Sequence, residues 1–152
     1  ECANRLRDFD ILLAIEFMAP LHKRREKKYE FIWNAKDAMG LAQDSGQNVG
    51  LHLDAWHWHH SGGTIEEILE AKGSVHAVQF SDAPDLPPEK IQDYQRVEPG
   101  MGVIPLEAFF NALRAIDYRG CVSPELFGVT VGLPPEQGAA IGRRSISKYI
   151  GE

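Results

Sequence analysis

The sequence predicts an α/β fold made of four successive strand–helix units, such as those that build a (β/α) barrel. Three observations support this. An apolar strand pattern followed by a helical pattern occurs four times, no change in composition marks a second domain, and polar residues gather where the predicted strands end. Alternating strands and helices imply parallel strands joined by right-handed crossovers. We therefore interpret residues 1–152 as part of one barrel domain.

The four predicted strands are 11–17 (ILLAIEF), 49–54 (VGLHLD), 75–81 (VHAVQFS) and 121–125 (CVSPE). Each combines apolar and β-branched residues, which is typical of buried strands. An open nucleotide-binding sheet would need a glycine-rich turn after its first strand, and the residues IEFMAP provide none. A barrel is therefore favoured, because its chemistry lies at the carboxyl ends of the strands.

Helices are predicted at 31–46, 64–72, 105–117 and 135–149, and residues 1–10 resemble the end of a further helix. Thr64 precedes acidic residues and is a typical N-cap. Gly46 and Gly73 are typical of helix ends, and Pro105 and Pro134 suit helix starts.

Composition excludes several classes of protein. With 43% hydrophobic and 25% charged residues, the chain has the balance of a globular domain, and no apolar run approaches the roughly 20 residues of a membrane span. The net charge of −6 argues against a nucleic-acid partner, and we interpret the short basic run at 22–28 as a solvated loop or helix end. The polar start is unlike a signal peptide. We expect a cytoplasmic protein with Cys2 and Cys121 reduced.

An oxygen-bearing side chain stands near the end of each predicted strand, namely Glu16, Asp54, Gln79 and Glu125. Side-chain alternation places each on the inward face of its strand. Buried acids on one face repel each other unless a cation lies between them. Carboxylate and amide oxygens favour Mn²⁺ or Mg²⁺, with Co²⁺ and Zn²⁺ as further candidates. We therefore expect a divalent-metal site with these four residues as ligands.

Alternatives remain for neighbouring residues. Asp54 alone could be a helix cap or a loop ion pair. In the segment DAWHWHH, which we expect to be a loop, the histidine side chains diverge and we expect only His57 to face the site. His59 and His60 are then rim residues, and Trp56 and Trp58 could serve packing or substrate stacking.

Five segments resemble, in order and over nearly the whole chain, the C-terminal half of the sugar phosphate isomerase/epimerase superfamily, the xylose isomerase-like TIM barrels: IEFM, LDAWHWHHSGG, VQFSDAP, RVEPGMGVIPL and VSPELF. The resemblance implies that the four strands correspond to strands five to eight of an eight-unit barrel. It implies a metal held by Glu16, Asp54, Gln79 and Glu125, although many members of the family have His where this chain has Gln79. It also implies substrate contacts from His57 and Arg96.

The resemblance further implies a metal-dependent isomerase or epimerase of a sugar, a sugar phosphate or an inosose, which acts through an enediolate. Glu16 and Glu125 are the expected acid–base pair. Asp82 could orient Arg96 or simply cap the loop 82–104, and the PGMG run at 99–102 is expected to be a turn. Alternatives are a metal-dependent dehydratase or lyase on the same scaffold, or a non-catalytic half barrel. An endonuclease is disfavoured by the acidic charge.

Four parallel strands alone would leave two open sheet edges. Either four upstream units complete the barrel, or two copies of the chain pair into an eight-stranded barrel. We favour the missing half, because these 152 residues hold no counterpart of the substrate-binding side chains that would complement the metal set.

Overall fold

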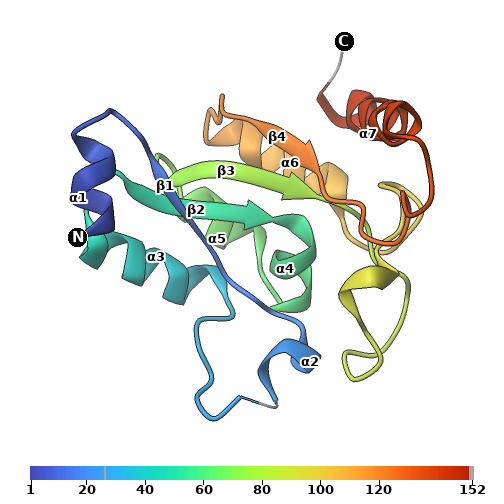
Figure 1. Ribbon diagram of the computed structural model, residues 1–152, viewed down its shortest axis with the longest axis horizontal. Coiled ribbons are helices and arrows are strands. Elements are labelled where there is room, and N and C mark those ends of the chain that lie inside the picture. Colours follow the sequence, from blue (N-terminus) through green and yellow to red (C-terminus); the bar gives the residue numbers. More distant parts are fainter. Residues whose placement is uncertain (26, 151–152) are drawn as a thin grey trace.

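A single sheet of four parallel strands forms the centre of the computed structural model, which describes residues 1–25 and 27–150 (Figure 1). The strands are β1 (Leu13–Glu16), β2 (Val49–Asp54), β3 (Val75–Phe80) and β4 (Val122–Pro124). They pair in chain order, each parallel to the next. All four strands were predicted at these places, and each differs from the predicted range by two residues or fewer at either end.

Helices follow the strands as predicted. The described elements are α1 (Cys2–Arg7), α2 (Leu21–Arg24), α3 (Ala35–Ser45), α4 (Ala55–His60), α5 (Ile65–Glu70), the 3₁₀ helix η1 (Asp93–Gln95), α6 (Leu106–Ala115) and α7 (Pro135–Ile150). Thr64 caps α5 with a full capping box, in which Glu67 returns a hydrogen bond to the Thr64 backbone. Among these helices, α2, α4 and η1 were not predicted.

The sequence prediction was wrong about one segment and about the start of one helix. The segment after β2 is the helix α4 rather than a loop, because Asp54 accepts a hydrogen bond from the Trp56 backbone and so caps a helix. The helix α3 begins at Ala35 and not at residue 31, because the Asn34 side chain accepts a hydrogen bond from the Asp37 backbone and fixes the start there.

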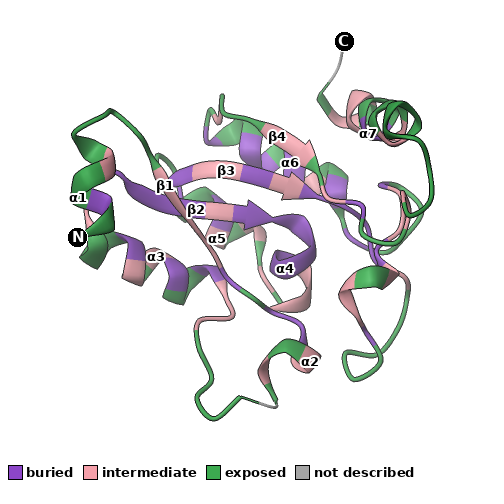
Figure 2. Cartoon of the chain, in the orientation of Figure 1, coloured by how far each residue is buried: buried purple, intermediate pink, exposed green. Residues whose placement is uncertain are grey.

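The main hydrophobic core lies between one face of the sheet and the helices that follow the strands. Leu51 and Leu53 of β2 and Val78 and Phe80 of β3 are all at most 1% exposed. Phe80 packs edge-to-face on Phe110 of α6, with ring centroids 5.4 Å apart. Each such buried side chain contributes about 1.5 to 3 kcal/mol. Figure 2 shows most of β2 and the first part of α4 buried, so the end of β2 is closely packed.

The opposite face of the sheet bears the residues that the sequence predicted to point inward. Register places Glu16 beside His52, Asp54 beside Gln79, and Gln79 beside Ser123. His52, Gln79 and Ser123 are partly exposed, unlike their neighbours on the core face. Polar side chains from adjacent strands therefore lie side by side near the carboxyl ends of the strands.

Among the described residues, no helix is both long enough and apolar enough to cross a membrane.

Candidate metal centre

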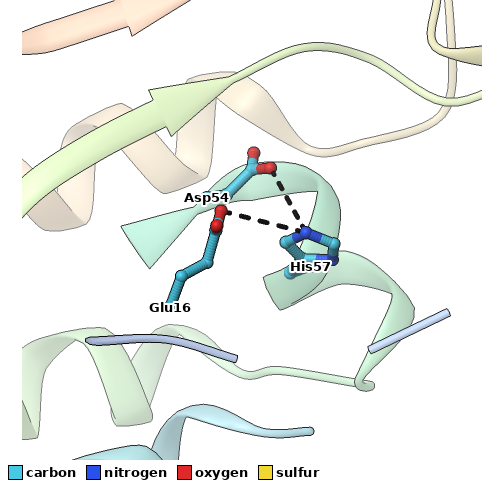
Figure 3. A group of neighbouring side chains, drawn as sticks. All are labelled: Glu16, Asp54 and His57. Atoms are coloured by element: carbon cyan, nitrogen blue, oxygen red, sulfur yellow. Dashed lines mark ion pairs between the residues drawn. The ribbon is translucent and has the colours of Figure 1, made fainter. Parts of the chain in front are cut away.

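Glu16, Asp54 and His57 converge above the carboxyl ends of β1 and β2 (Figure 3). His57 Nε2 lies 3.8 Å from Glu16 Oε1 and 3.9 Å from Asp54 Oδ2, and one potential ligand atom from each residue lies within 4.8 Å of the others. These separations are too long for hydrogen bonds. Ligand atoms around one divalent ion stand about 3 to 4 Å apart, because each is about 2 Å from the ion. The spacing is therefore compatible with a shared cation.

Asp54 serves the fold and the site with different oxygens. Its Oδ1 accepts a 3.0 Å hydrogen bond from the Trp56 backbone, which starts α4. Its Oδ2 faces His57 and Arg96 instead. Because His57 lies in the first turn of the helix that Asp54 caps, the cap also fixes the position of the histidine beside the acids. The cap interpretation of Asp54 and the site interpretation are thus both compatible with the structure.

Arg96 links Asp54 to Glu125. Its guanidinium group lies 2.7 Å from Asp54 Oδ2 and 2.7 Å from Glu125 Oε2, and its side chain is only 1% exposed. The same group stacks over the rings of Trp56, at 5.0 Å, and Phe127, at 5.4 Å. In this structure the arginine predicted to contact substrate is bound to two predicted metal ligands, and Trp56 packs against it.

The charges of the group do not balance. When Glu16, Asp54 and Glu125 are all ionised, their three charges exceed that of the Arg96 guanidinium by two, and the carboxylates repel one another. Burial raises the pKa of Glu16 to about 7, and the charges of Asp54 and Glu125 add to the rise. Burial also raises the pKa of Glu125, although Arg96 opposes the shift. Burial lowers the pKa of His57 to about 4, so the imidazole is neutral at neutral pH.

These residues fit a divalent cation. Glu16 Oε1, which faces His57 Nε2, is buried with no hydrogen-bond partner, which is costly for a polar atom. Two charges from a metal would cancel the excess negative charge, and a neutral imidazole is the form of histidine that ligates. Oxygen ligands suit Mn²⁺ and Mg²⁺, whereas the imidazole also suits Zn²⁺.

Gln79 lies beside Asp54 in the sheet. Its role as a ligand stays a prediction. His59 and His60 are half-buried, and His60 packs edge-on against Trp56 with centroids 4.5 Å apart. Among the described residues, the acids and histidines spaced closely enough to share an ion are Glu16, Asp54 and His57.

Sequence reasoning missed α4, which positions His57, and the contacts of Arg96. The signal for α4 was present in the order of residues, since aspartate is a preferred N-cap and Asp54 is the last residue of the predicted strand. The contacts of Arg96 left no comparable signal, because they depend on the path of the segment between β3 and α6.

The family profile of the xylose isomerase-like TIM barrels matches residues 1–149. The chain belongs to this family. Its four parallel βα units are consistent with half of such a barrel.

Individual proteins are also similar to this chain. An inosose isomerase of Bacillus velezensis is 40% identical over 129 residues, which are 84% of this chain and 44% of the relative. A crystal structure of the IOLI protein with a bound zinc atom superposes with a TM-score of 0.83 at 27% identity, over 99% of this chain and 54% of that one. A 3-dehydroshikimate dehydratase of Pseudomonas putida is 29% identical over 138 residues, 88% of this chain and 21% of the relative. The chain therefore spans about half, or less, of the length of these proteins.

Proposed function

We propose that this chain contributes the metal-binding half of a divalent-metal-dependent isomerase or epimerase that acts on a sugar, a sugar phosphate or an inosose. The observation that carries the proposal is the group of Glu16, Asp54 and His57, whose ligand atoms lie within 4.8 Å of one another and whose acids are not fully neutralised by Arg96. The inosose isomerase relative supports the reaction class, and the zinc atom in the IOLI structure supports a metal.

The proposed ligands are Glu16, Asp54, Gln79 and Glu125, with His57 close enough to join them. Mn²⁺ and Mg²⁺ suit the oxygen donors, and His57 makes Zn²⁺ a third candidate. A cation bound there would act as a Lewis acid toward a substrate carbonyl.

The chain's own residues would handle the proton and hold the substrate. Isomerisation removes a proton from the carbon next to a carbonyl and returns it to a neighbouring position, so two groups must exchange protons with the substrate. Glu16 ends β1 and Glu125 follows β4, at the two edges of the sheet, so they approach the site from opposite sides. His57 and Arg96 would contact substrate oxygens, and the Arg96 charge would stabilise developing negative charge.

Calorimetric titration of Mn²⁺ into the chain tests the metal proposal. We expect Glu125→Gln to weaken Mn²⁺ binding by at least about tenfold, because it removes one charged donor. The control is Glu70→Gln, which changes an exposed glutamate at the end of α5. Equal Mn²⁺ affinity in the two variants would contradict the proposal, provided that circular dichroism shows the same helix content.

A substrate panel tests the reaction class. Inososes, ketoses and ketose phosphates are incubated with the Mn²⁺-loaded full-length protein, which carries both halves of the proposed barrel, and proton exchange from the carbon next to the carbonyl is followed by NMR in heavy water. We expect exchange with at least one class of substrate. Exchange must be lost in Glu125→Gln and kept in Glu70→Gln.

A dehydratase is the second candidate, because the Pseudomonas putida relative is a 3-dehydroshikimate dehydratase. Elimination of a hydroxyl group begins with the same proton removal, so the same site could serve it. Adding 3-dehydroshikimate to the panel separates the two, since loss of water converts this unsaturated ketone into an aromatic product with a distinct ultraviolet spectrum.

We further propose that residues 1–152 are the C-terminal half of one barrel domain and that four more βα units complete it. Among the described residues, β1 and β4 each pair with a strand on one side only. Phe9 and Leu12, which precede β1, are 77% and 59% exposed. Light scattering tests this, because an active monomer of 152 residues would contradict it. A dimer would favour pairing of two copies.

A further inference from the structure

We infer that Asp82 is a positioning residue, which holds the segment 96–104 so that Arg96 reaches both Asp54 and Glu125. The inference rests on the proposed metal centre, because Asp54 and Glu125 are two of its ligands. Asp82 itself stands two residues after the end of β3 and is 1% exposed.

The Asp82 carboxylate binds the backbone of the following loop. Oδ1 accepts hydrogen bonds from the backbone of Ala83, at 2.8 Å, and of Ile104, at 2.9 Å. Oδ2 accepts from the backbone of Gly100, at 2.9 Å, and of Gly102, at 3.0 Å. Hydrogen bonds to a charged acceptor contribute about 1.5 to 3 kcal/mol each. With its oxygens bonded in this way and buried, the carboxylate serves the loop rather than a metal.

The Asp82 backbone fixes the other end of the same segment. Asp82 donates a 3.1 Å hydrogen bond to the Val97 carbonyl and accepts one of 2.9 Å from the Val97 amide, in an antiparallel bridge. Val97 adjoins Arg96. One residue thus holds the chain next to Arg96 with its backbone and the turn beyond it with its side chain.

Two glycines show that the turn is built closely around this carboxylate. Gly100 has a φ of +88°, a conformation that other residues rarely adopt. At Gly102, a Cβ atom would overlap the Ala83 carbonyl oxygen and crowd Asp82 Oδ1. The backbone can therefore approach the carboxylate closely only because these positions lack side chains.

Positioning matters because Arg96 makes two short ion pairs at once. Its guanidinium group is 2.7 Å from each of its two partners, on either side of the site. A small shift of the backbone at Val97 would break at least one pair. The loop capped by Asp82 consequently affects the charge at the metal centre although Asp82 touches no proposed ligand.

A double-mutant cycle of Asp82→Asn and Arg96→Ala tests the inference on the 152-residue chain. The asparagine keeps the shape but replaces one acceptor oxygen with a donor that faces backbone N–H groups. Two quantities are measured for all four proteins: the affinity for Mn²⁺ and the urea midpoint of the metal-free chain. The control is Asp85→Asn, an exposed aspartate in the same loop.

We expect Asp82→Asn to change Mn²⁺ affinity by about fivefold when Arg96 is present and by less than about twofold in the Arg96→Ala background. We also expect Arg96→Ala to lower the urea midpoint less in the Asp82→Asn protein, where Arg96 is already displaced. Equal effects of Asp82→Asn in both backgrounds would overturn the inference, because a purely structural role does not depend on Arg96. Asp85→Asn should change neither quantity.

The experiment distinguishes failure of the proposed function from failure of the inference about Asp82. If the unmodified chain binds no Mn²⁺ but the urea midpoints remain coupled, the proposed function fails and the positioning of Arg96 by Asp82 stands. If Asp82→Asn does not fold, Gly102→Ala displaces the same turn without removing the carboxylate, and its effect on the urea midpoint must likewise depend on Arg96. An effect of Gly102→Ala that is independent of Arg96 overturns the inference.

Discussion

Arg96 forms a 2.7 Å ion pair with Asp54, and the side chains of both residues are buried, at 1% and 0% exposed. From the sequence, Arg96 was expected to contact the substrate and Asp54 to bind the metal. Their pairing means that part of the negative charge of the site is neutralised by the protein itself. Negative charge remains, and it increases as Glu16 ionises around pH 7, so the site attracts a divalent cation even with the arginine in place.

Removing the arginine should destabilise the metal-free chain. Arg96→Ala leaves Asp54 buried without its charge partner, and breaking a buried pair in this way costs about 3 to 5 kcal/mol. Mn²⁺ should restore part of the loss, because it binds the folded state and supplies the missing positive charge. Urea unfolding at pH 7 with and without Mn²⁺ measures both effects.

The matched control for this prediction is Arg119→Ala. Arg119 also pairs with an aspartate, Asp117, but both side chains are exposed. Such pairs contribute little to stability. A loss in Arg96→Ala no larger than the loss in Arg119→Ala would show that the buried pair is not important for stability.

The pKa of Glu16 predicts how metal-free stability depends on pH. Its folded pKa of about 7 lies above the ordinary value of 4.5, so the folded state binds a proton more tightly than the unfolded state does. The contribution of Glu16 is fully present below pH 4.5 and is lost as the pH rises toward 7. We expect Glu16→Gln to remove this part of the pH dependence, as measured by urea unfolding in steps from pH 4.5 to 8.

Metal affinity should have the opposite dependence on pH. Protons compete with the cation for the Glu16 carboxylate, so Mn²⁺ binding should strengthen as the pH rises through about 7. His57, with a pKa of about 4, stays neutral over this range and does not contribute to the pH dependence of Mn²⁺ affinity. Calorimetry from pH 6 to 8 measures the effect, and an affinity that does not change would show that Glu16 is not a ligand.

The sequence predicted the strands and the residues at their ends because both follow from local rules. Apolar alternation located β2 and β3. The parallel arrangement then required Asp54 and Gln79 to lie side by side near the carboxyl ends of these strands. Thr64 was recognised as a cap because its partners are near in sequence. These features need no knowledge of distant contacts.

The rest of the site depends on contacts between distant segments. Arg96 reaches Asp54 across 42 positions of sequence, and Asp82 holds Ile104 across 22. No periodicity records such pairs, because each depends on the path of an irregular loop. The helix α4 was missed for another reason, since six residues rich in His and Trp show too few turns for a helical pattern.

The capping box of α5 provides a test of the fold that leaves the site untouched. Thr64→Ala removes the acceptor for the Glu67 backbone and should destabilise the chain by about 1 kcal/mol. Mn²⁺ affinity should not change, because α5 lies against α6 on the outer side of the sheet (Figure 1). Urea unfolding and calorimetry on the same sample check both statements, and a change in affinity would mean that α5 influences the site.

Two neutral residues, His57 and Gln79, compete for the role of the remaining ligand, and the choice of metal distinguishes them. Imidazole nitrogen favours Zn²⁺ more than an amide oxygen does, whereas the amide oxygen suits Mn²⁺. If His57 binds the ion, His57→Ala should weaken Zn²⁺ binding more than Mn²⁺ binding, and Gln79→Ala should do the reverse. Because His57 Nε2 lies within 4 Å of two acids, we expect a loss of Zn²⁺ affinity of at least about tenfold for His57→Ala. The control is His59→Ala on the same helix, and unchanged affinity for both metals in His57→Ala would leave His57 with the substrate-binding role that the sequence implied.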